Sequence, residues 1–219
     1  MSTSGELKKE YSLRFSGLEE YRDGVWKVLC KGFFSKYISS TDTLVDVGAG
    51  YGEFSRNISA AKKYAIDLNP DTEALVGPAV NFLNQDCSKD WPIEDESLDV
   101  VFTSNFFEHL PTKGLIEDTV LQAYRKLKPG GKIICLGPNI RFVPGDYWDY
   151  WDHHVAISDN SIAELLELKG FSISEKVDRF LPYTMSGGST PPLFFVSLYI
   201  RFPFLWRFFG KQFFVVATK

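Results

Sequence analysis

Short apolar runs alternate with helix-like segments along this chain from residue 43 onwards. An apolar run of a few residues predicts a strand buried on both faces, and apolar residues at every third or fourth position predict a helix. Strands and helices that alternate in this way are typical of βαβ units and a parallel sheet. The predicted strands lie at residues 44–47, 63–67, 80–85, 98–105, 127–135, from 171 onwards and at 212–218, and the predicted helices at 18–38, 52–60, 70–75, 112–127 and 158–169.

Three glycines alternate directly after the first predicted strand, at Gly48, Gly50 and Gly52. Glycine is required where the backbone approaches a ligand closely or adopts a positive φ. Three glycines in five positions are denser than an ordinary turn needs. The segment therefore predicts a backbone cradle for a nucleotide-sized cofactor.

The residues around these glycines limit which nucleotide fits. Glu53 stands where the dinucleotide pattern G-x-G-x-x-G has its third glycine, and a carboxylate there would repel a diphosphate. No Gly-Lys-Ser/Thr follows, which excludes a P-loop. Asp46 lies inside the strand, where a buried carboxylate needs hydrogen bonds or a cation. The pattern favours a ligand that carries positive charge, and a nicotinamide-dependent oxidoreductase is the weaker alternative.

Polar residues also follow the later strands, in an order that resembles a known family. Asp67 ends the second strand about 20 residues past the glycines. Asp86 follows the third strand, Glu108-His109-Leu110 the fourth, and residues 127–135 form a turn and a fifth. Over residues 40 to 140 these segments resemble the type 11 methyltransferases of the class I S-adenosylmethionine-dependent family. The resemblance implies an α/β, Rossmann-like, seven-stranded and mostly parallel sheet of order 3-2-1-4-5-7-6, with an antiparallel last strand and helices on both faces.

The resemblance also implies S-adenosylmethionine as the cofactor and S-adenosylhomocysteine as its product. Asp67 would bind the ribose hydroxyls and Asp86 the adenine amino group. Aspartate is also a common cap and turn residue, but three acids at three successive strand ends favour one shared ligand site. No metal is expected. The implied cofactor-binding residues are Asp46, Gly48, Ala49, Gly50, Gly52, Asp67, Leu68, Asp86, Cys87 and Asn105.

All three histidines follow predicted strands four and five, at the edge where open α/β sheets bind ligands. Methyl transfer to a hydroxyl needs an aligned nucleophile and a base, and histidine suits the base near neutral pH. His109, His153 and His154 are therefore the candidate catalytic residues. For His109 the alternative, which we favour, is local packing at the start of a helix.

Four residues after the fifth strand are candidates for contact with the methyl acceptor: Asn139, Arg141, Tyr147 and Trp148. The alternatives are turn chemistry for the first two and a surface loop with packed rings for the others. Residues 139–183 resemble methyltransferases of glycan and secondary-metabolite pathways. This resemblance implies a small polar acceptor, with O-methylation of a sugar or secondary-metabolite hydroxyl.

Residues 193–209 are unusually apolar, but Arg201, Pro203 and Arg207 interrupt them, so they are too short for a membrane span. Arginines among aromatic residues suit a peripheral membrane contact or a lipid-linked acceptor. The favoured alternative is a helical excursion that covers the core or forms a dimer contact. A non-catalytic binding protein on the same fold is a further alternative.

Chain length, net charge and the number of cysteines limit the classes of protein to which this chain can belong. A chain of 219 residues suits one domain, with an N-terminal helical cap (1–40), a cofactor-binding core (41–140) and an acceptor-side segment with the last strands (141–219). The net charge of -4, without a long basic run, argues against nucleic acid as a partner, and the resemblance implies a small molecule instead. Three separated cysteines and no apolar leader in residues 1–10 predict a cytoplasmic location. Tyr11 and Arg14 are candidate cofactor contacts, although solvation is favoured for Arg14.

Overall fold

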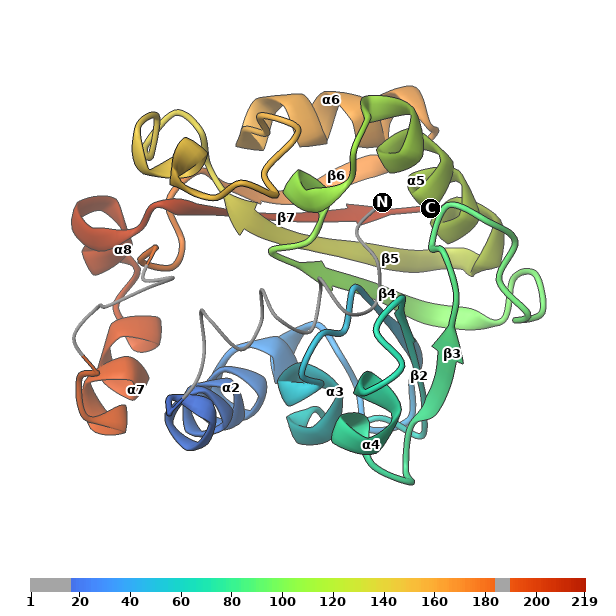
Figure 1. The fold of residues 1–219 in the computed structure, drawn as a ribbon, viewed down its shortest axis with the longest axis horizontal. Coiled ribbons are helices and arrows are strands. Elements are labelled where there is room, and N and C mark those ends of the chain that lie inside the picture. The colour runs from blue at the N-terminus through green and yellow to red at the C-terminus, as the bar shows by residue number, and fades with distance from the viewer. Residues whose placement is uncertain (1–16, 184–189) are drawn as a thin grey trace.

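The structure is a computed structural model that describes residues 17–183 and 190–219. Seven strands form one sheet in the order β3-β2-β1-β4-β5-β7-β6 (Figure 1). The first five strands run parallel, and β7 pairs antiparallel with both β5 and β6. The strands are β1 (Thr43–Val47), β2 (Lys62–Asp67), β3 (Asn81–Asn84), β4 (Leu98–Ser104), β5 (Leu127–Pro138), β6 (Ser172–Val177) and β7 (Gln212–Thr218). The predicted order and the antiparallel last strand are confirmed.

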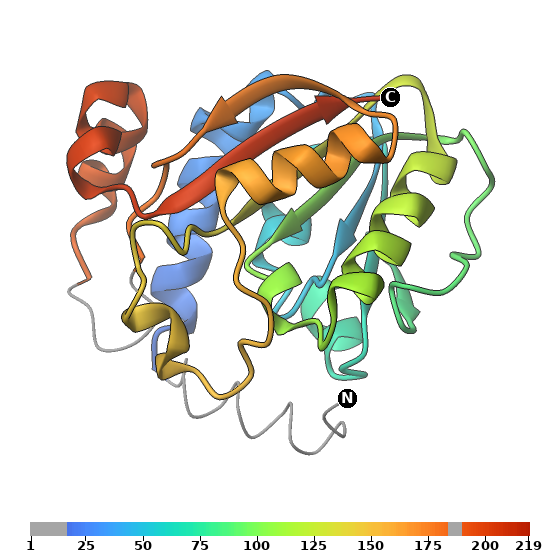
Figure 2. The same ribbon diagram turned by 90° about the horizontal axis from the view of Figure 1, so that it is seen from above.

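Helices cover both faces of the sheet, as predicted (Figures 1 and 2). Helices α5 and α6 lie on one face, and α2, α3 and α4 on the other. Helices α7 and α8 stand at the end of the molecule opposite β3. The helices are α2 (Glu19–Gly32), α3 (Glu53–Asn57), α4 (Thr72–Val76), α5 (Lys113–Lys126), α6 (Asp159–Leu168), α7 (Leu193–Arg201) and α8 (Pro203–Phe209), with short 3-10 turns η1 (Phe34–Lys36), η2 (Phe107–His109) and η3 (Asp146–Asp149).

The period-two pattern of the strands divides the core between the two faces. In β1, Val45 and Val47 pack under α5 and α6, whereas Leu44 packs on the side of α2 and α3. That second side is rich in aromatic rings, and Phe54 stacks on Phe102 with ring centroids 3.6 Å apart. A rigid, packed sheet therefore lies behind the strand ends that carry the candidate site residues.

Two helical segments are interrupted, one where the sequence suggested continuity and the other at a proline. The helix predicted over 18–38 ends at Gly32, and a 3-10 turn follows. The break lets Phe33 and Phe34, which are neighbours in sequence, both be buried. Pro203 starts α8 and separates it from α7, because proline lacks the N–H that a continuous helix would use. No helix in the part of the chain that the structure describes is long and apolar enough to cross a bilayer.

Candidate functional site

A cavity of about 1120 Å³ opens at the carboxyl ends of the parallel strands. All the predicted cofactor-binding residues except Gly52 line it. Loops after β1, β2, β3 and β4 supply them, because parallel strands bring their carboxyl ends to one edge of the sheet. His109, Asp152 and His154 line the same cavity.

Each glycine of the loop after β1 has a positive φ, and two of them are also packed closely. A Cβ on Gly48, at φ 74°, would lie 2.2 Å from Cγ of Phe106. A Cβ on Gly52, at φ 70°, would lie 2.6 Å from a methyl carbon of Val76 in α4. Gly50 has a φ of 53°. Backbone conformation and packing thus require glycine here, and Gly52 serves the contact between loop and helix rather than the cavity wall.

Two acids are held by short hydrogen bonds at the strand ends. Asp67 Oδ2 accepts from the Gly50 amide and Oδ1 from the Asn69 amide, each at 2.8 Å. Asp86 Oδ1 accepts from the Ser88 amide at 2.9 Å and from its hydroxyl at 2.8 Å. A carboxylate oxygen can accept more than one hydrogen bond, so both groups can still receive hydroxyl or amino donors from a ligand.

Asp46 is the most deeply buried acid of the loop, with 3% of its surface exposed. Burial raises its pKa to about 7, the hydrogen bond from Ser55 Oγ at 2.6 Å opposes the shift, and the charges of Asp67 and Glu53 add to it. Its partner is thus a serine hydroxyl rather than the loop amides. A cation bound in the cavity would favour the ionised form of this carboxyl.

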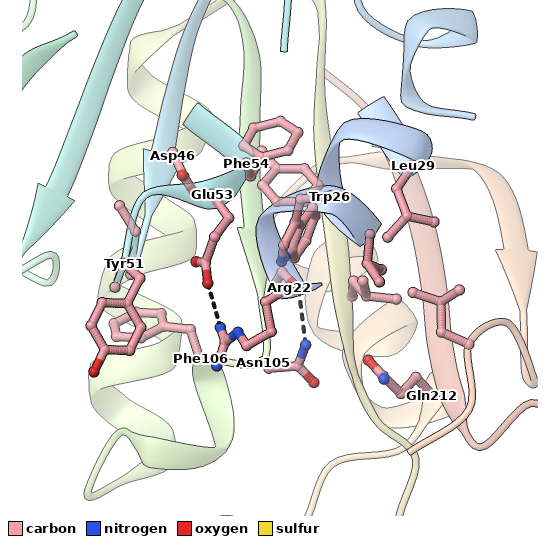
Figure 3. A pocket seen from close by; sticks show the side chains of 18 of the residues that line it. Arg22, Trp26, Leu29, Asp46, Tyr51, Glu53, Phe54, Asn105, Phe106 and Gln212 are labelled. Atoms are coloured by element: carbon pink, nitrogen blue, oxygen red, sulfur yellow. Dashed lines mark hydrogen bonds and ion pairs between the residues drawn. The ribbon is translucent and has the colours of Figure 1, made fainter. Parts of the chain in front are cut away.

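Glu53, the first residue of α3, does not face the cavity as an isolated charge. Figure 3 shows it paired with Arg22 of α2, whose Nη2 lies 2.9 Å from Glu53 Oε1. The guanidinium also lies over the Tyr51 ring, 5.7 Å from its centroid. The repulsion of a diphosphate that we expected from Glu53 is therefore offset, and the case against a dinucleotide rests on the glycine spacing and on the other acids of the cavity, Asp46, Asp67 and Asp86.

Asn105 contributes a buried side-chain amide to the cavity. Its φ is 48°, and its Nδ2 donates to Ser104 Oγ at 3.0 Å. Among the described residues, nothing donates to its Oδ1. The side chain lies at the cavity, next to Arg22 (Figure 3). A buried unpaired oxygen is costly, so this atom suits a donor on a ligand.

The three histidines have different positions. His109 Nδ1 lies 2.9 Å from Asp152 Oδ2, and both side chains line the cavity. His154 is exposed at the rim. His153 is 5% exposed and packs its ring on His109, with centroids 4.8 Å apart, but it does not line the cavity. A carboxylate on one ring nitrogen orients an imidazole, so His109 has the geometry of a positioned base.

Glu108 lies behind His109 and is buried, and burial raises its pKa. Its Oε1 is 3.9 Å from His109 Nε2. Glu108, His109 and His153 offer ligand atoms that all lie within 4.8 Å of one another. Ligand atoms around a tetrahedral zinc ion are about 3.4 Å apart, so these groups would have to move closer to hold one.

None of the four predicted acceptor residues lines the cavity. Asn139 is fully buried and donates to Asp159 Oδ1 at 2.8 Å, and Arg141 pairs with the same carboxylate at 2.9 Å. Tyr147 is fully buried and donates to the Val155 carbonyl at 2.5 Å. Trp148 is 52% exposed. The polar groups of Asn139, Arg141 and Tyr147 are used to fix the chain after β5, which an isolated sequence pattern does not reveal.

The far end of the cavity is apolar. Helix α2 supplies one side and α7 the other. A lipid-linked acceptor along residues 193–209 was one alternative from the sequence, whereas the part that α2 plays was not predicted. Gln212 adds a buried Oε1 without a hydrogen-bond partner among the described residues. Tyr11 and Arg14 lie outside the described residues. The apolar wall residues include Val25, Trp26, Leu29, Leu136, Phe195, Val196 and Tyr199.

Residues 45–135 match a protein-family model described as a methyltransferase domain. Uncharacterized methyltransferases of Mycobacterium bovis and Mycobacterium tuberculosis are 32% identical over 107 residues, which are 44% of this chain and 41% of theirs. A ubiquinone/menaquinone biosynthesis C-methyltransferase of Bartonella quintana is 25% identical over 146 residues, which are 59% of this chain and 55% of that protein. The chain therefore matches about half the length of these curated relatives.

Solved structures share the fold over almost the whole chain. A Haloferax volcanii methyltransferase, in complex with the Trm112 methyltransferase activator, has a TM-score of 0.68 at 19% identity and covers 99% of this chain and 97% of that chain. A SAM-dependent methyltransferase of Archaeoglobus fulgidus has a TM-score of 0.66 at 18% identity and covers 92% of this chain and 97% of its own. At these identities the likeness shows the fold alone.

Proposed function

Because this chain carries a methyltransferase domain on the class I S-adenosylmethionine-dependent fold, we propose that it methylates a hydroxyl of a small, partly apolar acceptor. The observation that carries the proposal is one cavity lined both by the glycine loop with its acids and by His109 with Asp152. When bound, S-adenosylmethionine supplies a methyl group activated by a positive sulfur. The protein has to hold this donor, align the acceptor and remove its proton.

The residues present fit such a donor. Asp67 would accept from the ribose hydroxyls and Asp86 from the adenine amino group. The unpaired Asn105 Oδ1 would accept from the ammonium of the methionyl part, which also brings positive charge near Asp46. An acidic, glycine-lined site suits a cationic nucleoside better than a diphosphate, which supports the methyl donor over a nicotinamide cofactor.

His109 is the base that the geometry supports. Asp152 lies 2.9 Å from Nδ1 and stabilises the tautomer with the proton on that nitrogen. Nε2 then carries the lone pair that can take the acceptor's proton. His153 and His154 remain candidates, but one is behind the cavity wall and the other is exposed at its rim.

The acceptor has to fit both the polar part of the cavity, at His109 and Asp152, and its apolar part between α2 and α7. The sequence favoured a hydroxyl of a sugar or of a secondary metabolite. The apolar wall of α2 and α7 supports the secondary metabolite, which is the less polar of these two classes. Gln212 Oε1 would accept a hydrogen bond from a second polar group of the acceptor. One relative is named a C-methyltransferase, so carbon is the alternative target atom.

A lipid-linked acceptor at a membrane surface is the second candidate. The observation that favours it is that Phe195 and Phe209 line the cavity and are also 56% and 60% exposed, so apolar surface continues out of the cavity mouth. The three cysteines are free and buried, which agrees with the proposal of a cytoplasmic, reducing location.

Labelled methyl transfer tests the proposal. Purified protein is incubated with methyl-labelled S-adenosylmethionine and with extracts separated into water-soluble and solvent-soluble fractions. We expect label in a solvent-soluble small molecule, and loss of most of it with His109→Ala while S-adenosylhomocysteine still binds. Label only in polar sugars would contradict the apolar acceptor, and bound cofactor without any label transfer would favour a non-catalytic protein.

A further inference from the structure

Helices α7 and α8 expose a continuous set of large apolar side chains, which we call the aromatic patch. Its residues recur at every fourth position, at 194, 198 and 202 and again at 204 and 208. The rings of Phe202 and Phe204 lie 6.0 Å apart and join the two rows. Contiguous exposed apolar surface of this kind marks an interaction site. The patch consists of Phe194, Phe195, Leu198, Phe202, Phe204, Phe208 and Phe209, each between 37% and 73% exposed.

The opposite sides of these helices are firmly anchored. Ile200 and Trp206 are buried, and Trp206 Nε1 donates to the Tyr199 carbonyl at 3.0 Å. Helix α2 meets α7 at two glycines: a Cβ on Gly24 would lie 2.8 Å from Leu193 and one on Gly32 2.7 Å from Ile200. The patch is therefore presented by packed helices and does not result from a poorly docked segment.

The segment that carries the patch has basic residues and no acidic ones. Residues 190–219 contain no aspartate or glutamate, although the chain as a whole has a net charge of -4. Arg201 and Arg207 are exposed on the same two helices, and neither forms an ion pair with another described residue. Lys211, just beyond α8, pairs with Asp146 at 3.4 Å. Aromatic side chains with arginines and no acids are the composition of a segment that lies in a membrane interface.

We propose that the aromatic patch docks this protein on the surface of an anionic lipid bilayer. The phenylalanine rings would enter the boundary between headgroups and acyl chains, while Arg201 and Arg207 bind the headgroups. A second copy of the chain fits this patch less well, because the two facing segments would each bring Arg201 and Arg207 and no acidic residue of their own to pair with them.

Docking would also turn the cavity mouth towards the lipid. Phe195 and Phe209 belong to both the patch and the cavity wall, so an amphipathic acceptor could pass from the bilayer into the cavity without crossing water. This delivery step rests on the proposed function, whereas docking itself does not.

Vesicle sedimentation of the full chain tests docking without any cofactor. Vesicles of phosphatidylcholine alone are compared with vesicles of equal parts phosphatidylcholine and phosphatidylglycerol. The patch variant is Phe204→Ser with Phe208→Ser, and the charge variant is Arg201→Gln with Arg207→Gln. The matched control is Leu121→Ser with Leu168→Ser, which removes two side chains that are 45% and 75% exposed on α5 and α6. Thermal unfolding of each variant checks that it is folded.

We expect the wild-type protein and the control to pellet with the anionic vesicles. The patch variant should bind at least about tenfold more weakly, and each arginine lost should weaken binding about fivefold. Absence of wild-type binding, or equal binding by the folded patch variant, would overturn the proposal. The proposal would also be overturned if sedimentation velocity showed that the wild-type protein is a dimer and the patch variant a monomer, and if the wild-type protein did not bind vesicles. Because no methyl donor is present, failed docking and failed methyl transfer are separate results.

Discussion

Asp46 is subject to two opposing influences on its charge. Burial favours the neutral carboxyl and raises its pKa to about 7, whereas a cation in the cavity favours the carboxylate. In the folded protein the raised pKa means that the neutral form dominates below about pH 7 and the charged form above it. Binding of a cationic nucleoside should then release a proton, so its affinity should rise as the pH rises.

We therefore predict that S-adenosylhomocysteine, which carries an ammonium group, binds about tenfold more tightly near pH 8 than near pH 6. The expected tightening follows from ionisation of Asp46 through its raised pKa. Calorimetric titrations at both pH values measure it. Asp46→Asn should bind more weakly and lose most of the pH dependence. An unchanged pH dependence in that variant would assign the proton to another group.

His109 and His154 provide a matched pair for testing the base. Both line the cavity, but only His109 has a carboxylate, that of Asp152, at 2.9 Å from its ring. His109→Ala should lower kcat by about 10² to 10⁴, the usual contribution of a general base, and leave cofactor affinity intact. His154→Ala should change kcat little. Steady-state kinetics with cofactor titration tests both, and equal losses in the two variants would count against His109.

At the scale of elements, the loop between β1 and α3 is defined by its backbone. The alternating glycines predicted the backbone conformation of this loop, because a run of positive φ values is a local property that a short sequence can reveal. The sequence did not show which neighbouring residues require glycine at these positions. Phe106 comes from the loop after β4 and Val76 from α4, and both would clash with an added Cβ.

Gly48→Ala should therefore lose at least about tenfold in S-adenosylhomocysteine affinity and unfold at a lower temperature, because it adds both backbone strain and a clash. Gly130→Ala is the matched control: its φ is 80°, close to the 74° of Gly48, but nothing lies within 4 Å of its added Cβ. It should lower stability through strain alone and keep cofactor affinity. Calorimetry and thermal unfolding of both variants separate the two effects, and similar affinity losses would contradict a role for loop packing.

The polar residues after β5 form contacts that the sequence did not predict. Asn139, Arg141 and Tyr147 have the residue types of an acceptor site, but they bond to Asp159 and to backbone groups instead. Short sequence patterns do not distinguish a polar group that fixes a turn from one that is available to bind a ligand. The pairs Arg22–Glu53 and His109–Asp152 were missed for a related reason, because their members come from separate elements.

At the scale of the whole molecule, topology explains why the residues of the proposed donor site line one cavity and the four predicted acceptor residues do not. Parallel strands bring Asp46, Asp67 and Asp86 to one edge, so their order along the chain already implied a shared cavity. The acceptor end depends on how α2 and α7 pack together over that edge. Their apolar stripes predict burial equally well against a core or around a ligand.

The most direct test of the central claim is calorimetric titration of S-adenosylhomocysteine and of NAD into the wild-type protein and into Asp67→Ala. Asp67 is hydrogen-bonded to the glycine loop and lines the cavity, so its loss should remove both a ligand contact and a support of the cradle. We predict saturable binding of S-adenosylhomocysteine, no binding of NAD, and an affinity loss of at least about tenfold in the variant. Absence of S-adenosylhomocysteine binding to the wild-type protein, or equal affinity in a folded Asp67→Ala variant, would contradict the account.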